Sequence, residues 1–502
     1  MDIPYELSLD FLESKHSDYI NSEELNTQLY PLIEGSTVLE KVKGQFLPIR
    51  AGEVPEAYTA RLKKFTYTNL LSSALLELTS KLAAGSYSIS NLPDNDFWKN
   101  FRENTSKKKG QSELKLLQRI FREALIYKKV FVQVDKPLAP FIPRNRAEEE
   151  ALNLNPYTIL HNCRDVYDWT EDDTGSLTFI KIRQLVEYRP DPFTKPVPQV
   201  IWTIITPELI LRYSALVELK NNQIVTLIKD GKIVPVTPKD TYISLDQEPI
   251  YHGFSSFPVL KFELPSELYA MNHAYLKAKE YLTIENNRFD AAGMAYIQRI
   301  FKPIQETLPN LEIAVKEEET PISSNAHIMK VEEFEFKEMQ GSVLTILSTL
   351  LADLENQIKD ILNLGCISSD KGAVQQSGIS KKFDLHSEEM VMRSYGKLLL
   401  EFLQDLIQLV ASAIGLPSET INSISVTGYE SFELDSLDSL LATANELIKV
   451  DPYIPQTSKR LFAKSLSSQL APNASSEEKE LVNSEIEALT FELPELSTNP
   501  TV

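Results

Sequence analysis

The chain has 502 residues, of which 42% are hydrophobic and 24% are charged, an ordinary composition for a globular protein with roughly two to four packed domains. Acidic side chains outnumber basic ones, 71 Asp and Glu against 51 Lys and Arg, so the formal net charge is −20. This excess excludes a protein that grips nucleic acid over a broad basic surface, although nucleic acid that passes without adhering stays possible.

The two cysteines, Cys163 and Cys366, lie far apart in the sequence. This spacing predicts neither a disulfide framework nor a zinc module, and it fits a reducing cytosol. The N-terminal residues mix acids with aromatics and lack the basic and apolar regions of a secretory signal, and no apolar run of about 18 residues follows. We therefore expect a chain that is neither exported by such a signal nor inserted in a membrane.

Helical periodicity dominates the first part of the chain. Apolar residues recur at helical spacing between Val54 and Ala84 and predict one helix there, and a second helix is predicted over Ser112 to Tyr127. From about Tyr157 to Phe262 the pattern changes to short β-rich runs, which predict an antiparallel sheet. Asp230 and Gly231 fall between two such runs and predict a tight hairpin turn, because Gly accepts a positive φ at little steric cost.

Three long helices are predicted next. The first begins near Ser266, after Pro265, and reaches about Tyr296, a length of about 45 Å at 1.5 Å per residue. The second covers Ser342 to Leu364 and the third Phe383 to Ile414, each followed by a glycine that ends it. Between the first two, residues 298–338 contain a strand-like alternation and predict a small, partly β insertion.

The segment Gly372 to Lys382, GAVQQSGISKK, is small, polar and flexible, and it separates the second long helix from the third. It is interpreted either as a functional loop held out by two rigid helices or as a plain disordered connection. Its position, where a short turn would suffice, favours the functional loop. Beyond it, helices are predicted over 437–450, 457–470 and 476–489, before a tail rich in Glu.

Motifs for catalysis are absent from the sequence: it has no Walker-type phosphate loop, no GxGxxG and no GxSxG. His161, Cys163 and Asp165 alternate and are interpreted either as metal ligands on one strand face or as a strand end of mixed exposure. No partner cluster for a fourth ligand is visible, which favours the second interpretation. No cofactor is expected.

Two charged runs also have a functional and a structural interpretation. Glu171, Asp172 and Asp173 could bind a divalent ion, or they form a solvated turn before Thr174 and Gly175. The basic run from Lys107 to Lys109 could touch phosphate, or it is a solvated connection. The structural interpretation is favoured for both.

Three blocks and their order carry a family resemblance. They are GEVPEAYTARLKKFTYTNLLSSALLELTSKLAAG, then PYTILHNCRDVYDWTEDDTGSLTFIKIRQLVEY, then the order helix, insertion, helix, GAVQQSGISKK, helix. Together they resemble the portal proteins of tailed bacteriophages over roughly Gly52 to Leu489. No single motif is specific, since such families are held together by the order of their elements. In that family twelve subunits form a ring at one capsid vertex, and DNA is driven in by the terminase and later leaves through the axial channel.

The resemblance implies an α+β fold that is mainly helical, with an antiparallel β wing region, two long stem helices and a small α/β clip. It assigns residues 1–264 to the wing, 265–297 to the first stem helix, 298–338 to the clip and 339–365 to the second stem helix. Residues 366–382 become the tunnel loop, 383–417 a long wing helix, and 418–502 the crown and C-terminal tail.

The resemblance also implies partners and site residues. Expected partners are further copies of the chain, double-stranded DNA bound without sequence preference, the terminase large subunit, a head-tail adaptor and the major capsid or scaffold protein, all in a virion assembled in the host cytoplasm. The DNA-facing residues would be Lys371, Gly372, Gln375, Gln376, Ser377, Gly378, Ser380, Lys381 and Lys382. The partner-facing residues of the clip would be Lys316, Glu317, Glu318, Glu319, Glu332 and Glu333.

The acidic balance suits a channel for DNA. Twelve copies of a chain with a net charge of −20 carry −240, and an acidic wall repels phosphates so that DNA slides. Lys371, Lys381 and Lys382 are placed to centre the strand, or else they are solvated lysines near a helix start. The alternatives are another virion connector or adaptor, and a metal-dependent hydrolase that uses Asp172, Asp173 and Glu285.

Overall fold

The computed structural model describes residues 4–107, 110–137, 154–220, 223–229, 232–294, 298–303, 331–337, 342–362, 378–429 and 476–488, together with positions 148, 152, 457–460, 463–464 and 467. The chain divides into two compact units, Met1–Ser431 and Phe432–Val502. None of the helices in this described part is both long and apolar enough to cross a bilayer.

The first half of the larger unit contains a group of helices and the first strands of the sheets. Its elements are β1 (Glu6–Ser8), α1 (Leu9–Glu13), α2 (Ser17–Glu34), α3 (Ser36–Phe46), α4 (Pro55–Lys63), α5 (Leu70–Ala84), β2 (Tyr87–Ser90), α6 (Asp96–Glu103), α7 (Glu113–Tyr127), β3 (Lys129–Asp135), β4 (Tyr157–Asn162), β5 (Val166–Glu171), β6 (Leu177–Tyr188), β7 (Val197–Ile205) and β8 (Leu209–Lys220).

The second half completes the sheets and adds the long helices. Its elements are β9 (Gln223–Lys229), β10 (Lys232–Pro235), β11 (Tyr242–Ser244), β12 (Ile250–Tyr251), β13 (Val259–Glu263), α9 (Met271–Met294), β14 (Gln298–Pro303), β15 (Val331–Lys337), α10 (Ser342–Ile361), α11 (Gly378–Ala413), α12 (Ser418–Ser423) and β16 (Ser425–Gly428). In the smaller unit, α15 (Ser476–Ala488) confirms the helix predicted there, and Lys464 Nζ lies 2.8 Å from Glu487 Oε1.

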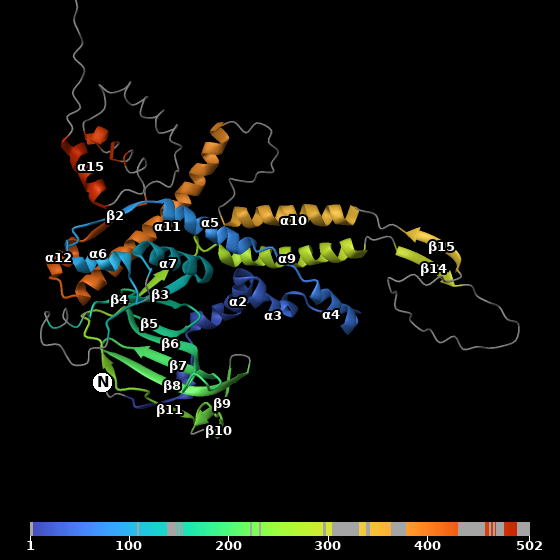
Figure 1. The fold of residues 1–502 in the computed structure, drawn as a ribbon, viewed down its shortest axis with the longest axis horizontal. Coiled ribbons are helices and arrows are strands. Elements are labelled where there is room, and N and C mark those ends of the chain that lie inside the picture. Colours follow the sequence, from blue (N-terminus) through green and yellow to red (C-terminus); the bar gives the residue numbers. More distant parts are fainter. Residues whose placement is uncertain are drawn as a thin grey trace, which may run out of the picture. The chain divides into compact units, whose positions relative to one another are not determined.

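A seven-stranded antiparallel sheet forms the centre of the larger unit, in the order β10-β9-β8-β7-β6-β5 with β12 paired to β8 (Figure 1). A three-stranded sheet, β13-β3-β4, lies against it, and β1-β11, β14-β15 and β16-β2 form separate pairs. The pairings between described strands are antiparallel, which confirms the predicted α+β class and the β-rich region. Strands β9 and β10 pair with Lys229 opposite Lys232, as expected for the predicted hairpin, although Asp230 and Gly231 lie outside the described residues.

The large sheet buries residues on both faces because side chains alternate along each strand. On one face Val200, Trp202 and Ile204 of β7 pack with Leu9 and Leu12 of α1. The other face packs against β3, β13 and α2 through Ile180, Ile182, Ile205, Phe131, Val259 and Tyr19. The N-terminal segment is therefore part of the core.

Polar contacts also hold the N-terminal segment to the sheet. Lys181 is fully buried, and its ammonium donates to Phe11 O at 2.7 Å and to Ser14 Oγ at 2.6 Å. Glu13 Oε1 accepts from Arg183 Nε and from Trp202 Nε1, each at 2.9 Å. Burial lowers the pKa of Lys181, since the charged form loses hydration that these partners replace only in part.

The helix predicted over Val54 to Ala84 is wrong as one element, because α4 ends at Lys63 and α5 begins at Leu70. The intervening residues, Phe-Thr-Tyr-Thr, are β-branched or aromatic and favour helix weakly. Asn69 then caps α5 by accepting from Ser72 N at 2.9 Å. The prediction for Ser112 to Tyr127 is confirmed by α7, which Ser112 caps.

The first long helix also differs from its prediction, since α9 begins at Met271 and not near Ser266. Residues 265–269 instead form turns, with Leu268 N donating to Pro265 O at 3.0 Å. The hydroxyl of Tyr269 donates to Ile126 O at 2.9 Å, and Lys128 Nζ donates to Ser266 Oγ at 3.3 Å. These contacts with the end of α7 fix a non-helical entry into α9.

The helix α11 starts earlier than predicted, at Gly378 rather than Phe383. Adding a residue to an existing helix gains one hydrogen bond per residue fixed, and Lys is a good helix former, so a long helix extends readily through Lys381 and Lys382. Its other end agrees with the prediction. Gly415 has φ of +74° and Leu416 N donates to Ala411 O at 3.1 Å, a glycine-terminated C-cap.

Candidate functional site

The helices α9 and α10 lie side by side, and β14 and β15 follow from their ends (Figure 1). We call α9, β14, β15 and α10 together the arm. On α10 the buried residues Leu351, Leu354, Ile358 and Leu362 recur at steps of three and four and form one apolar stripe. On α9 the matching buried residues include Ala274, Ala278 and Leu282. The predicted pair of long helices is thus an antiparallel pair closed by its own apolar faces.

The second half of α9 is joined to the segment between α4 and α5. Glu285 of α9 accepts from Thr68 N at 3.0 Å and from Thr68 Oγ1 at 2.6 Å. Asn286 accepts from Thr66 N at 3.1 Å and donates to Thr66 O at 2.9 Å. Glu285 and Asn286 are both buried, so two side chains of α9 satisfy the backbone of a segment more than two hundred residues earlier.

A second joint lies one turn further along α9. The guanidinium of Arg50 donates to Asn287 Oδ1 at 2.6 Å and lies 3.0 Å from Asp290 Oδ2. Arg61 is buried and lies 2.7 Å from Glu53 Oε2, which in turn accepts from Arg50 N at 2.9 Å. Through these contacts the helical layer before α5 holds the arm at two consecutive turns.

At the far end of the arm, β14 and β15 form an antiparallel pair. The register runs from Gln298 opposite Lys337 to Lys302 opposite Glu333, with an irregularity before Pro303. The two strands flank the segment 304–330, which agrees with the predicted β character of the insertion. Lys316, Glu317, Glu318 and Glu319 lie outside the described residues, and Glu332 and Glu333 lie in β15. The assignment of this region to a clip stays a prediction.

The arm leaves apolar side chains uncovered. Val343, Ile346 and Leu350 of α10 are 43%, 59% and 42% exposed. Their spacing of three and four residues puts them on one helix face, which adjoins the stripe that packs on α9 and lies nearer the start of α10. A row of exposed large aliphatic residues along one helix is a surface suited to contact with another protein. We call these three residues the exposed stripe.

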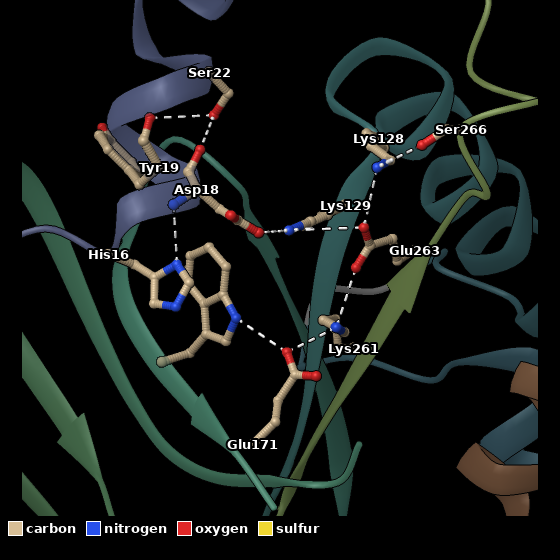
Figure 2. Close-up of polar contacts among 11 residues, drawn as sticks. His16, Asp18, Tyr19, Ser22, Lys128, Lys129, Glu171, Lys261, Glu263 and Ser266 are labelled. Atoms are coloured by element: carbon tan, nitrogen blue, oxygen red, sulfur yellow. Dashed lines mark hydrogen bonds and ion pairs between the residues drawn. The ribbon is translucent and has the colours of Figure 1, made fainter. Parts of the chain in front are cut away.

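A charged cluster joins α2 to the small sheet (Figure 2). Lys129 Nζ lies 2.6 Å from Asp18 Oδ2 and 3.7 Å from Glu263 Oε1, and Lys128 Nζ lies 3.4 Å from the same Glu263 oxygen. Lys261 Nζ lies 3.1 Å from Glu263 and 2.7 Å from Glu171, so Lys261 and Glu171 are the third cation and the third anion of the cluster. The hydrogen bond from Lys129 lowers the pKa of Asp18.

Three ammonium groups and three carboxylates alternate in this cluster, and each has an opposite charge within 4 Å. Glu171 also accepts from Trp169 Nε1 at 3.1 Å, and the Trp169 ring stacks on His16 with 4.0 Å between centroids. A cavity of about 350 Å³ lies beside Asp18 and Lys129. Because the three positive charges balance the three negative ones, we interpret the cluster as a structural contact that holds α2, β3, β5 and β13 together.

The candidate metal ligands do not form a site. His161 Nε2 lies 2.8 Å from Gln133 Oε1 on the neighbouring strand β3, and Cys163 is buried. Burial lowers the pKa of His161 to about 4 and raises the pKa of Cys163 to about 11. Among the described residues, no group of three or more His, Cys, Asp or Glu side chains is arranged to hold a metal ion.

The other chemical candidates have structural roles in this fold. Asp172 Oδ1 accepts from Thr174 N at 2.8 Å and from Ser176 N at 3.0 Å, which confirms the solvated turn predicted before Thr174 and Gly175. Glu285 is 9% exposed and is bound to Thr68, so it does not meet Asp172 and Asp173 in the turn. Lys107 lies over the ring of Tyr157, 4.2 Å from its centroid, and the next two lysines lie outside the described residues.

The DNA-facing residues predicted from the resemblance fall into two groups. Lys371, Gly372, Gln375, Gln376 and Ser377 lie outside the described residues. The second group, Gly378, Ser380, Lys381 and Lys382, belongs to the first turns of α11. The predicted loop therefore ends before Gly378. The contact of these residues with DNA stays a prediction.

Sequence reasoning missed one exposed feature, the tip of the β6–β7 hairpin, residues 189–196. Every residue from 184 to 196 is exposed, and Phe193 is 98% exposed. The signal is visible in the sequence RPDPFTKP, where three prolines bracket an aromatic residue. Prolines stiffen a loop, so an aromatic residue between them is held in place rather than folded back.

Comparison with known proteins does not identify a family for this chain. No family model matches the chain, and no curated protein matches it. Among solved structures, one similar chain comes from the neck of an empty GTA particle with C6 symmetry. It is 11% identical with a TM-score of 0.37, and the match covers 78% of this chain and 89% of that chain. This likeness is weak, and no functional statement follows from it.

Proposed function

We propose that this chain is a subunit of a head-to-tail connector ring of portal type in a tailed phage or phage-like virion. The ring has a structural and not a catalytic role. Double-stranded DNA passes through its channel, the terminase and later an adaptor dock on the strands at the end of the arm, and capsid or scaffold protein surrounds the ring. The sequence blocks that resemble portal proteins support this proposal, together with the arm.

The arm is the observation that carries the proposal. Two long helices, held along the second half of α9 by the contacts of Glu285, Asn286 and Arg50, present the exposed stripe of α10. A monomer gains nothing from three uncovered aliphatic residues on a rigid helix, whereas a neighbouring copy that covers them gains roughly 1.5–3 kcal/mol for each side chain it buries fully. Packing of arms from successive copies would line a channel with helices.

The chemistry of the described residues supports a structural role. Three of the candidate catalytic groups are bound by structural partners: His161 binds Gln133, Glu285 binds Thr68, and Asp172 binds the backbone of its own turn. The net charge of −20 per copy also suits a wall that repels phosphate.

The exposed stripe gives a direct test. Ile346→Glu places a charge in the proposed contact, whereas Ser348→Glu places the same charge about 200° away around the helix. We expect Ile346→Glu to reduce ring formation by tenfold or more. A tenfold change in an association constant corresponds to about 1.4 kcal/mol, and burying an unpaired carboxylate costs more than this. Ser348→Glu should assemble as the unmodified chain does.

Light scattering and negative-stain images of the purified proteins measure the outcome. Rings with a central hole in the unmodified chain, lost in Ile346→Glu at unchanged melting temperature, support the proposal. Compact monomers of the unmodified chain at every concentration would overturn it.

A further inference from the structure

The β6–β7 tip presents Phe193 on an ordered turn. Phe193 N donates to Asp191 Oδ1 at 2.8 Å, the Thr194 hydroxyl donates to the other carboxylate oxygen, and Thr194 N donates to Asp191 O at 3.3 Å. Pro190, Pro192 and Pro196 restrict the flanking backbone. The aromatic side chain is therefore displayed on a loop that loses little conformational entropy when it binds.

The same hairpin carries further uncovered apolar side chains. Leu185, Val186 and Tyr188 are exposed on β6 next to the tip. A single exposed aromatic residue is ordinary, but a fully exposed Phe on a rigid turn beside three exposed apolar residues has the features of an interface anchor.

A groove of about 630 Å³ lies at the other end of β6. Leu177, Phe257, Leu260, Leu409 and Ile421 supply its apolar lining, from β6, the loop before β13, β13, α11 and α12. The side chain of Phe has a volume well below that of the groove. Leu177 and Tyr188 are the two ends of β6, so the tip and the groove are separated by about 37 Å of strand. Within one copy, that separation keeps the tip out of the groove.

Charge distinguishes the tip from the groove. Arg189 and Lys195 flank Phe193, both are exposed, and neither forms an ion pair with another described residue. Asp191 is the acid of the tip, and its carboxylate is engaged in the turn, which lowers its pKa. The groove contains Asp405, and the turn that borders it adds Asp172 and Asp173.

The cation of the groove is already paired. Lys261 lies 2.7 Å from Glu171 and 3.1 Å from Glu263, so it does not neutralise Asp405 or Asp173. Asp172 remains an anion but is bound by its own turn. A tip whose two cations pair with no described residue and a groove with an acidic border are complementary in sign.

We propose that the Phe193 tip of one copy enters the groove between β13, α11 and α12 of a neighbouring copy. Phe193 fills the apolar lining, and Arg189 and Lys195 face Asp405 and the border aspartates. Since the two surfaces lie at different places on the chain, the contact is head-to-tail, and repeated copies close into a ring or extend as an open chain. This inference rests on the proposed function, because it names the contact that joins neighbouring subunits.

Cross-linking tests the contact. With Cys366→Ser as background and Cys163 buried, a chain carrying Phe193→Cys and Asn422→Cys should give a ladder of disulfide-linked dimers, trimers and higher species on a non-reducing gel. A mixture of the two single-cysteine chains should stop at dimers. The matched control, Phe193→Cys with Asp240→Cys, places the second thiol in an exposed loop outside the groove and should give no ladder.

Charge reversal tests the same contact without cysteines. Lys195→Glu and Asp405→Lys should each weaken assembly about tenfold, and the double variant should restore it, while the melting temperature stays constant because both side chains are exposed. Rings that form without the ladder and without rescue would overturn this contact and leave the proposed function standing. Monomers at all concentrations would overturn both.

Discussion

Individual buried polar residues hold distant parts of this chain together. His161 binds Gln133 across two strands, Glu285 binds Thr68, and Glu13 binds both Arg183 and Trp202. A buried polar group without a partner costs about 1–3 kcal/mol, so each of these pairs selects one arrangement of the chain. Sequence patterns drew attention to His161 and Glu285 because of their chemistry, and the fold uses both for structure.

His161 makes stability depend on pH. Its folded pKa of about 4 is below the ordinary value of 6.5, so the unfolded chain takes up a proton first as the pH falls. The contribution of this group is complete above pH 6.5 and is lost as the pH falls toward 4, and it amounts to about 3 kcal/mol. Urea unfolding of His161→Gln should show a weaker loss of stability between pH 6.5 and 4 than the unmodified chain. Parallel curves would contradict this account.

Substitution of Glu285 tests whether its carboxylate has a structural or a catalytic role. Glu285→Ala leaves Thr68 N and its hydroxyl without their acceptor, so the free energy of unfolding should fall by about 1–3 kcal/mol. Glu280→Ala on the exposed side of the same helix is the control and should change the free energy of unfolding by less than about 0.5 kcal/mol.

DNA incubated with the unmodified chain and Mg²⁺ or Mn²⁺ should remain intact. Cleavage that Glu285→Ala abolishes would favour the hydrolase instead.

At the scale of elements, local sequence predicts most of the helices and the sheet region. Ser112, Asn69 and Gly415 are caps that the sequence displays, and α7, α10, α15 and the end of α11 follow the predicted ranges closely. The period of apolar residues also separates the β-rich region from the helices. These elements are predictable because their signals lie within a few residues of each boundary.

The boundaries that sequence reasoning missed depend on distant contacts. The break between α4 and α5 is held by Glu285 and Asn286, and the entry to α9 is held by Ile126 and Lys128. No local pattern contains this information. The β6–β7 tip differs, since its sequence RPDPFTKP is a local signal that was overlooked, and the structure adds that Phe193 is 98% exposed.

Gly415 tests the C-cap of α11. Its φ of +74° is a conformation that side chains with a Cβ rarely adopt, and nothing lies within 4 Å of the position that a Cβ would take. Gly415→Ala should therefore lower the free energy of unfolding by about 1 kcal/mol through backbone strain alone. Gly415→Asn should cost less, because Asn tolerates this conformation better. Equal losses measured in urea for both variants would point to a steric cause.

At the scale of the whole molecule, the sheets and the arm have separate roles. The sheet region buries its own core on both faces, whereas the arm leaves the exposed stripe uncovered. Stability is thus expected to depend on the sheets, and assembly on the arm and the β6–β7 tip.

The segment Gly372 to Ser377 has a predicted function that belongs to this scale. Deleting these six residues should leave ring assembly intact but reduce DNA packaging or retention, because under the proposed function they belong to the tunnel loop. Replacing Gln375 and Gln376 with Ser keeps the length and the polar composition of the segment, and this variant should package DNA normally. Wild-type DNA content in particles made with the deletion would remove the function assigned to the segment.

The attachment of the N-terminal segment has a consequence during synthesis. Residues 4–14 leave the ribosome long before Lys181, Arg183, Trp202 and Tyr213, which later bind them across separations of 167 to 209 residues. At about 5–20 residues per second, Leu9 and Leu12 wait roughly 10–40 s for the strands that bury them. The nascent chain therefore exposes a hydrophobic N-terminal segment throughout that delay. A chaperone that shields residues 4–14 would raise the yield of folded protein.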